Sequence, residues 1–91
     1  MKRETQHEQI LKYFKTHKTI TPMESFRELG ITKLATRISE MKRLGYLFGQ
    51  EMISVTNRHG EKVRVMEYRF IGRLYEETFY TAEEILENIA A

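Results

Sequence analysis

The residues best suited to chemistry in this sequence are the polar side chains between positions 33 and 43. Leu34, Ile38 and Met41 recur at helical spacing, which predicts a helix with one buried face over this segment. The polar residues point away from that face or flank it: Lys33, Thr36, Arg37, Ser39, Glu40, Lys42 and Arg43. Basic side chains bond guanine edges or phosphates, and small hydroxyls approach bases closely. The helix is therefore a candidate reader of the major groove of DNA.

Glu40 is the single carboxylate in this set, and two roles are open to it. It could accept a hydrogen bond from a cytosine amino group, or it could pair with Lys33, Arg37 or Arg43 and keep them ordered. If these charges only pair with one another, the segment is an ordinary solvated helix without a ligand.

A second group of basic residues lies at the tip of a predicted hairpin. Residues 52–56 and 62–70 alternate apolar and polar side chains and are rich in β-forming types, whereas residues 57–61 favour a turn. The basic group consists of Arg58, His59, Lys62 and Arg64. Such a tip can meet a phosphate strand or enter the minor groove, which attracts arginine, although charged tips can also serve solubility alone.

Other chemistries lack the residues they need. The 91 residues include no Cys and no Asp, so a thiolate metal site and the aspartate clusters of two-metal nucleases are not expected. The three histidines have no metal-ligand spacing, and the nuclease-like triplet at residues 40–42 has no aspartate partner. We therefore expect no enzyme, no cofactor, no metal and no small-molecule substrate. Without a long apolar run or a secretory signal, we expect a cytoplasmic protein with no membrane attachment.

Three threonine–glutamate capping boxes predict where helices begin. Thr5-x-x-Glu8 starts a first helix that should run to about His17, and the box at residues 21–24 starts a short second helix that Gly30 ends. About three residues then lead into the helix at 34, which is the spacing of a helix-turn-helix. A third box at residues 81–84 starts a final helix.

The order of these elements predicts an α+β, mainly α fold, a winged helix-turn-helix. It would comprise a three-helix bundle, a β-hairpin wing and an additional C-terminal helix. Ile20 is a candidate for a short strand added to the wing sheet. The apolar phase changes between Val65 and Met66, which predicts a bulge or a strand that leaves the hairpin for the core. We divide the chain into a winged domain, residues 1–71, and a connector with an acidic helix, residues 72–91.

The C-terminal segment differs from the rest in charge. Residues 33–69 carry eight Lys or Arg against four Glu, whereas residues 70–91 carry only Arg73 against five Glu. Residues 72–80 are expected to be a connector that packs through its aromatic side chains. The final helix has an apolar stripe that packs on the domain or contacts a partner: Ile85, Leu86 and Ile89.

Several motifs resemble a family of short helix-turn-helix proteins encoded by bacteriophages and prophages. The similar stretches, within residues 10–70, are 19–24, 29–31, 34–40, 44–46, 55–58 and 60–63. This resemblance implies a winged helix fold and DNA binding, and it does not extend beyond residue 70.

Two function hypotheses follow. The first is a sequence-specific or semi-specific double-stranded DNA-binding protein of a phage or mobile element, a transcriptional regulator that acts as a homodimer on two half-sites. The second is a small phage inhibitor or adaptor that uses the same scaffold to bind a host protein or a nucleic-acid-processing complex. The acidic C-terminal segment favours the second hypothesis, because it could imitate phosphates against a basic surface.

Overall fold

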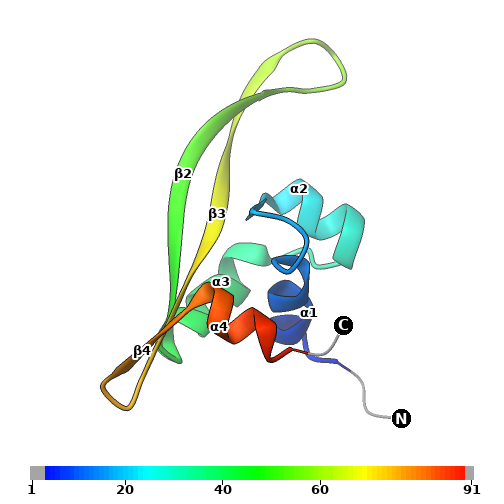
Figure 1. Ribbon diagram of the computed structural model, residues 1–91. Coiled ribbons are helices and arrows are strands. Elements are labelled where there is room, and N and C mark those ends of the chain that lie inside the picture. The colour runs from blue at the N-terminus through cyan, green and yellow to red at the C-terminus, as the bar shows by residue number, and fades with distance from the viewer. Residues whose placement is uncertain (1–3, 90–91) are drawn as a thin grey trace.

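The computed structural model describes residues 4–89, and Figure 1 shows its helices gathered beside a long, curved β-hairpin. The N-terminal half contains α1 (Gln6–Tyr13), β1 (Thr19–Ile20), α2 (Pro22–Glu24), the π-helical turn η1 (Ser25–Leu29) and α3 (Leu34–Arg43). The C-terminal half contains β2 (Tyr46–Thr56), β3 (Lys62–Tyr75), β4 (Thr78–Thr81) and α4 (Ala82–Glu87). Helices combined with one antiparallel sheet form the α+β class that the sequence predicts, but strands occupy about as much of the described chain as helices, so the expectation of a mainly α fold is wrong.

The capping threonines act at the helix starts where the sequence places them. Thr21 and Thr81 form complete boxes with Glu24 and Glu84, in which each side chain bonds the other residue's backbone N–H. Thr5 accepts from the backbone N–H of Glu8 at 3.1 Å, which is one half of such a box. The helix that follows Thr5 ends at Tyr13 rather than near His17, because residues 15 and 16 bond carbonyls three residues back and tighten the chain into a turn.

The connection between α2 and α3 is held by Ser25, a fully buried polar residue. Its hydroxyl donates to the carbonyl of Ile31 at 3.0 Å, and its own carbonyl accepts from the Ile31 backbone N–H at 3.1 Å. Gly30 supplies the left-handed conformation, φ 69°, that ends η1. These contacts set the angle at which α3 leaves the turn.

β3 is the central strand of the sheet. It pairs antiparallel with β2 along one edge and with β1 and β4 along the other. Ile20 pairs with Tyr68, so the predicted short strand beside the wing is confirmed. The two wing strands are longer than the alternation predicts, because pairing runs without a break from Thr56 and Lys62 down to Phe48 and Phe70.

A bulge is present in β3, but not at the change of apolar phase. Leu47 pairs with Gly72 and Phe48 with Phe70, so Ile71 is the extra residue. Between Val65 and Met66 the ladder is regular, and the two residues lie on opposite faces of the strand. The apolar phase changes because Val63 and Val65 lie on one face of β3, whereas Met66, Tyr68 and Phe70 lie on the face that continues into the core.

Residues 72–80 are not the connector that the sequence predicts. They form the end of β3, a two-residue turn and β4, so the chain makes a second hairpin. The turn residues Glu76 and Glu77 both have positive φ, 48° and 66°, as a tight hairpin turn of this hand requires. The aromatic residues Tyr75, Phe79 and Tyr80 are between 39% and 49% exposed instead of packed in the core.

The core lies between the helices and one face of the sheet. Phe14, Phe48 and Phe70 meet at its centre, with ring centroids 5.5–6.2 Å apart. α4 packs on this core from below in Figure 1. Its apolar stripe, Ile85, Leu86 and Ile89, is half-buried against the core cluster of the same chain.

The turn between α3 and β2 allows a test of this packing. Gly45 has φ 95°, and a Cβ built there would lie 2.2 Å from the backbone oxygen of Leu74. Gly30 has a similar φ, but a Cβ there meets nothing within 4 Å. We expect Gly30→Ala to cost about 1–2 kcal/mol of unfolding free energy, and Gly45→Ala roughly 2 kcal/mol more. Urea unfolding followed by circular dichroism measures both, and equal losses would contradict the close approach of β3 to this turn.

Candidate nucleic-acid interface

The fold exposes most of the polar residues that the sequence assigns to α3. Leu34, Ile38 and Met41 are buried, as the helical spacing predicts. Five of the polar residues are exposed to solvent: Lys33, Thr36, Ser39, Lys42 and Arg43. These residues combine three cations with two small hydroxyls, which suits both phosphates and base edges.

Arg37 and Glu40 lie on the flank of α3 that faces α1. Glu40 Oε1 bonds His7 Nε2 at 2.9 Å, and Glu40 Oε2 lies 3.3 Å from an Arg37 guanidinium nitrogen. Both residues are about one-third exposed, and Arg37 Nε is buried without a hydrogen-bond partner among residues 4–89. Because both of its oxygens are engaged within the protein, Glu40 fits the pairing role better than the cytosine role.

The electrostatics of Glu40 agree with this pairing. Its hydrogen bond to His7, and after that the charge of Arg37, hold the pKa of the Glu40 carboxyl below its ordinary value of 4.5. The carboxylate is therefore ionised in neutral solution and offsets the positive charge of Arg37. Sequence reasoning did not select His7 for this site, because it lies 33 residues away on another helix.

The hairpin tip is a compact turn organised by Asn57. The Asn57 side-chain oxygen accepts from the backbone N–H groups of His59 and Glu61 at 2.9 and 3.0 Å. The Asn57 backbone N–H donates to the Glu61 carbonyl at 2.8 Å, which closes the loop above the last strand pair. Arg58 and His59 are exposed at its apex. The turn thus presents two side chains of basic type from an ordered backbone.

The wing has two chemically different faces. Residues 50, 52, 54 and 56 of β2 pair with residues 68, 66, 64 and 62 of β3, and paired residues share a face. This face is continuous with the one that buries Phe48, Tyr68 and Phe70 lower down. Beyond the helices it carries exposed polar and basic side chains: Gln50, Ser54, Thr56, Lys62 and Arg64.

A contact between helix and wing joins the two groups of polar residues. The Lys42 ammonium donates to the Gln50 side-chain oxygen, so the end of α3 touches this face of β2. We call the resulting surface the basic strip. It comprises Thr36, Ser39, Lys42 and Arg43 of α3 together with Gln50, Ser54, Thr56, Arg58, His59, Lys62 and Arg64 of the wing. Gln50, Ser54 and Thr56 are absent from the sequence-based set, because only the strand register shows which face they share with Lys62 and Arg64.

The opposite face of the wing is apolar and turns toward α2. Ile53, Val55 and Val65 line a groove with Met23 and other residues of α2, and its volume is about 300 Å³. Glu51 and Glu67 also lie on this face. Ile53, Val55, Val65, Glu51 and Glu67 thus lie on the other face of the wing from the basic strip, whereas the exposed Met52 lies among the residues of the strip.

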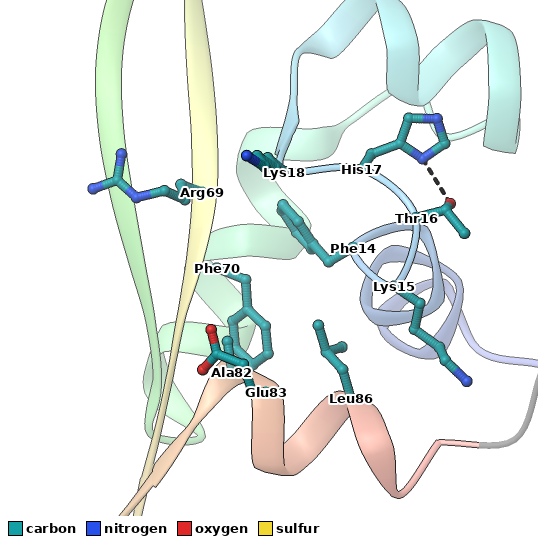
Figure 2. A pocket seen from close by; sticks show the side chains of 10 residues that line it. All are labelled: Phe14, Lys15, Thr16, His17, Lys18, Arg69, Phe70, Ala82, Glu83 and Leu86. Atoms are coloured by element: carbon teal, nitrogen blue, oxygen red, sulfur yellow. Dashed lines mark hydrogen bonds between the residues drawn. The ribbon is translucent and has the colours of Figure 1, made fainter.

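A larger cavity of about 450 Å³ lies between the end of α1, β3 and α4 (Figure 2). Phe14, Phe70 and Leu86 converge on it, and Lys15 points away toward the end of α4, where its ammonium bonds the Ile89 carbonyl. The guanidinium of Arg69 extends from β3 toward β2. The cavity is thus lined by apolar side chains of α1, β3 and α4 together with polar residues from the end of α1 and the turn after it.

Among residues 4–89, no group of three or more His, Cys, Asp or Glu side chains is arranged to hold a metal ion. None of the helices in that range is long and apolar enough to cross a membrane.

The comparisons with known proteins agree with this geometry. The model of the winged helix-turn-helix domain family matches residues 5–72, which is well over half of the chain, so the protein belongs to that family. The matched stretch runs from the cap of α1 to the bulge in β3. No curated protein and no solved structure matches the chain. Membership in this family indicates that the protein binds DNA.

The cluster of His7, Arg37 and Glu40 makes a pH-dependent contribution to stability. Because folding lowers the pKa of Glu40, its contribution is present above about pH 4.5 and is lost as the pH falls through the folded-state pKa. We expect Glu40→Gln to lower the unfolding free energy near pH 7, and we expect the difference from wild type to vanish near pH 3. Urea unfolding at several pH values measures this difference. Glu87→Gln on the exposed side of α4 is the control, and an equal loss there would contradict the assignment.

Proposed function

We propose that this protein binds double-stranded DNA through the basic strip, as a transcriptional regulator with sequence-specific or semi-specific recognition. In this arrangement α3 enters the major groove, and the wing follows the neighbouring phosphates or enters the minor groove. Lys42 and Arg43 contact guanine edges or phosphates, while Thr36 and Ser39 come close to bases or backbone.

The observation that carries the proposal is the continuity of the basic strip. Its helical part ends at Arg43 and its wing part begins at Gln50 in β2, and the contact between Lys42 and Gln50 joins the two. The carboxylates nearest to it are engaged within the protein. Glu40 pairs with His7 and Arg37, and Glu61 accepts a 3.4 Å hydrogen bond from the Asn57 amide. A surface of this sign attracts a polyanion.

Arg58 and His59 have a specific place in this proposal. The wing extends well beyond α2, so its tip contacts DNA at a distance from the segment that α3 reads (Figure 1). The hydrogen bonds around Asn57 order the tip before binding, which reduces the entropy lost when arginine enters a groove. Contacts by the wing then add to affinity more than to base selectivity.

The resemblance to helix-turn-helix proteins of phages and prophages supports a role in regulating a mobile element. A regulator of that kind needs no catalytic group, which agrees with the absence of Asp and Cys from the sequence. The acidic C-terminal segment lies outside the basic strip, so it leaves that surface free for DNA.

A salt titration tests the proposal directly. We expect binding of random double-stranded DNA to weaken with salt at a log–log slope of about −4, which corresponds to four or five neutralised phosphates. Arg43→Ala and Arg58→Ala should each reduce the magnitude of the slope by about 1. Lys15→Ala is the matched control, because its ammonium bonds the end of α4 and lies outside the strip. Binding that does not depend on salt, or an equal effect of Lys15→Ala, would overturn the proposal.

Two adjacent residues of β2 test which face of the wing meets DNA. Ser54 lies on the basic strip, and Val55, also exposed, lies on the opposite face. We expect Ser54→Glu to weaken DNA binding roughly fivefold or more, because it brings a negative charge near phosphates at a cost of about 1 kcal/mol. Val55→Glu should change affinity less than twofold. Fluorescence anisotropy with a labelled duplex measures both affinities, and the reverse order would show that the other face of the wing binds.

A further inference from the structure

An exposed apolar surface lies at the base of the sheet, on the side away from the helices. Leu47 pairs with Gly72, and Leu74 pairs with Phe79, so the side chains of these strand pairs share a face. Leu47, Leu74 and Phe79 are 41%, 53% and 47% exposed. We call these three side chains, together with the Gly72 backbone between them, the base patch. Ile71, the extra residue of the bulge, is also exposed beside it.

The base patch is flattened by Gly72. A Cβ at this position would lie 2.8 Å from the Phe79 ring and 2.3 Å from the Tyr80 backbone oxygen. The ring therefore lies directly over the glycine, and a side chain at residue 72 would displace it. The result is an exposed apolar surface without a protruding centre, a shape that suits the packing of one sheet on another.

The two ends of the base patch carry opposite charges. Arg69 lies three residues before Gly72, and its guanidinium covers Gly49 on the same face, as the 2.8 Å approach to a Cβ built at Gly49 indicates. In Figure 2 the guanidinium of Arg69 extends from β3 toward β2, away from the ring of Phe70. Glu76 and Glu77 lie four and five residues after Gly72, in the turn that projects from the base of the sheet (Figure 1).

This pattern is self-complementary. We propose that a second copy of the chain packs on the base patch in an antiparallel, two-fold symmetric dimer. An axis beside Gly72 brings Arg69 of each copy opposite Glu76 and Glu77 of the other, since the cation lies three residues before the glycine and the acidic turn lies four and five residues after it. The patch contains no charged side chain, so the centres of the two copies do not repel each other.

The exposed apolar area matches the centre of a dimer interface but does not by itself require one. The three side chains and Ile71 expose roughly 400 Å², within the range of the largest patches on monomeric proteins. A standard interface buries about 800 Å² on each partner, and homodimer interfaces are about two-thirds apolar. The patch thus supplies most of the apolar centre, and the charged ends together with β4 supply the rim.

The dimer itself does not depend on DNA, but its consequence for DNA rests on the proposed function. The base patch lies on the face of the sheet opposite Phe48 and Phe70, whereas the wing residues of the basic strip continue the face of Phe48 and Phe70, so the interface leaves the strip uncovered. Two copies would then present two recognition helices and two wings to one duplex. Binding through two recognition helices would raise the affinity and the sequence selectivity for DNA above those of a single small domain.

Sedimentation equilibrium of the full chain without DNA, from about 5 to 500 µM, tests the proposal. We expect a dimer with a dissociation constant on the order of 10 µM. Leu74→Ser should weaken it at least tenfold. Phe26→Ser, which alters a similarly exposed apolar residue on η1, should leave it within twofold of wild type. A monomer at 500 µM, an unaffected Leu74→Ser, or a dimer lost in Phe26→Ser would each overturn the proposal.

A charge exchange tests the orientation without altering the apolar patch. Arg69→Glu alone and the pair Glu76→Arg with Glu77→Arg should each weaken the dimer about tenfold, because like charges then face each other. The three changes together should restore it to within threefold of wild type. Glu67→Gln should tighten it, since this carboxylate neighbours Arg69 on the same face. A triple variant as weak as the single exchanges would overturn the antiparallel arrangement. Loss of DNA binding with an intact dimer would contradict only the proposed function.

Discussion

The alternation of side chains along β3 is the constraint on which most of this structure depends. Its 14 residues pair on both edges, so the register is set on either side and each residue is assigned to one face. In the middle of the strand, one face buries Tyr68 and Phe70 against the helices. The same face continues upward as the polar side of the wing. A slip of one residue would move the aromatic core into solvent and Lys62 and Arg64 to the other face. Stability and the basic strip therefore depend on the same register.

The bulge at Ile71 determines which side chains face each side at the base of the sheet. Because β3 has one extra residue there, the side chains of residues 72–75 alternate in the opposite phase from those before the bulge. Arg73 then lies over the rings of Tyr46 and Tyr75, with its guanidinium carbon 4.5 and 4.8 Å from their centroids, and donates to the Leu44 carbonyl at 2.9 Å. Leu74 is directed to the opposite side, where it joins Leu47 and Phe79. A single inserted residue thus accompanies both the anchoring of β3 to the turn between α3 and β2 and the exposed base patch.

Charge in this protein is arranged by face rather than by segment alone. Glu40 and Glu61 are held by internal hydrogen bonds, and Glu51 and Glu67 lie on the side of the wing that turns toward α2. Of the other nine acidic residues, five lie in the C-terminal hairpin and helix, and four, Glu4, Glu8, Glu24 and Glu28, lie at or in α1, α2 and η1. This separation explains how a chain with a net charge of only +2 presents a surface that suits a polyanion.

The sequence alone determined the local elements of this protein. Capping threonines mark the helix starts, Gly30 ends the second helical segment, and the spacing of Leu34, Ile38 and Met41 identifies the buried face of α3. These features depend on contacts within a few residues, which is why periodicity and turn chemistry reveal them. The winged order of elements and the exposed basic residues of α3 and the wing tip follow from the same signals.

Only the tertiary structure decided which distant residues meet. The pairing of His7 with Glu40, the contact between Lys42 and Gln50, and the addition of Ser54 to the basic strip depend on packing and strand register. The aromatic residues at 75–80 resemble core residues in a one-dimensional pattern, yet the bulge and the turn at Glu76 and Glu77 leave them on a second hairpin at the surface. Burial is a property of the assembled sheet, and no local pattern in the sequence specifies which of its faces remains uncovered.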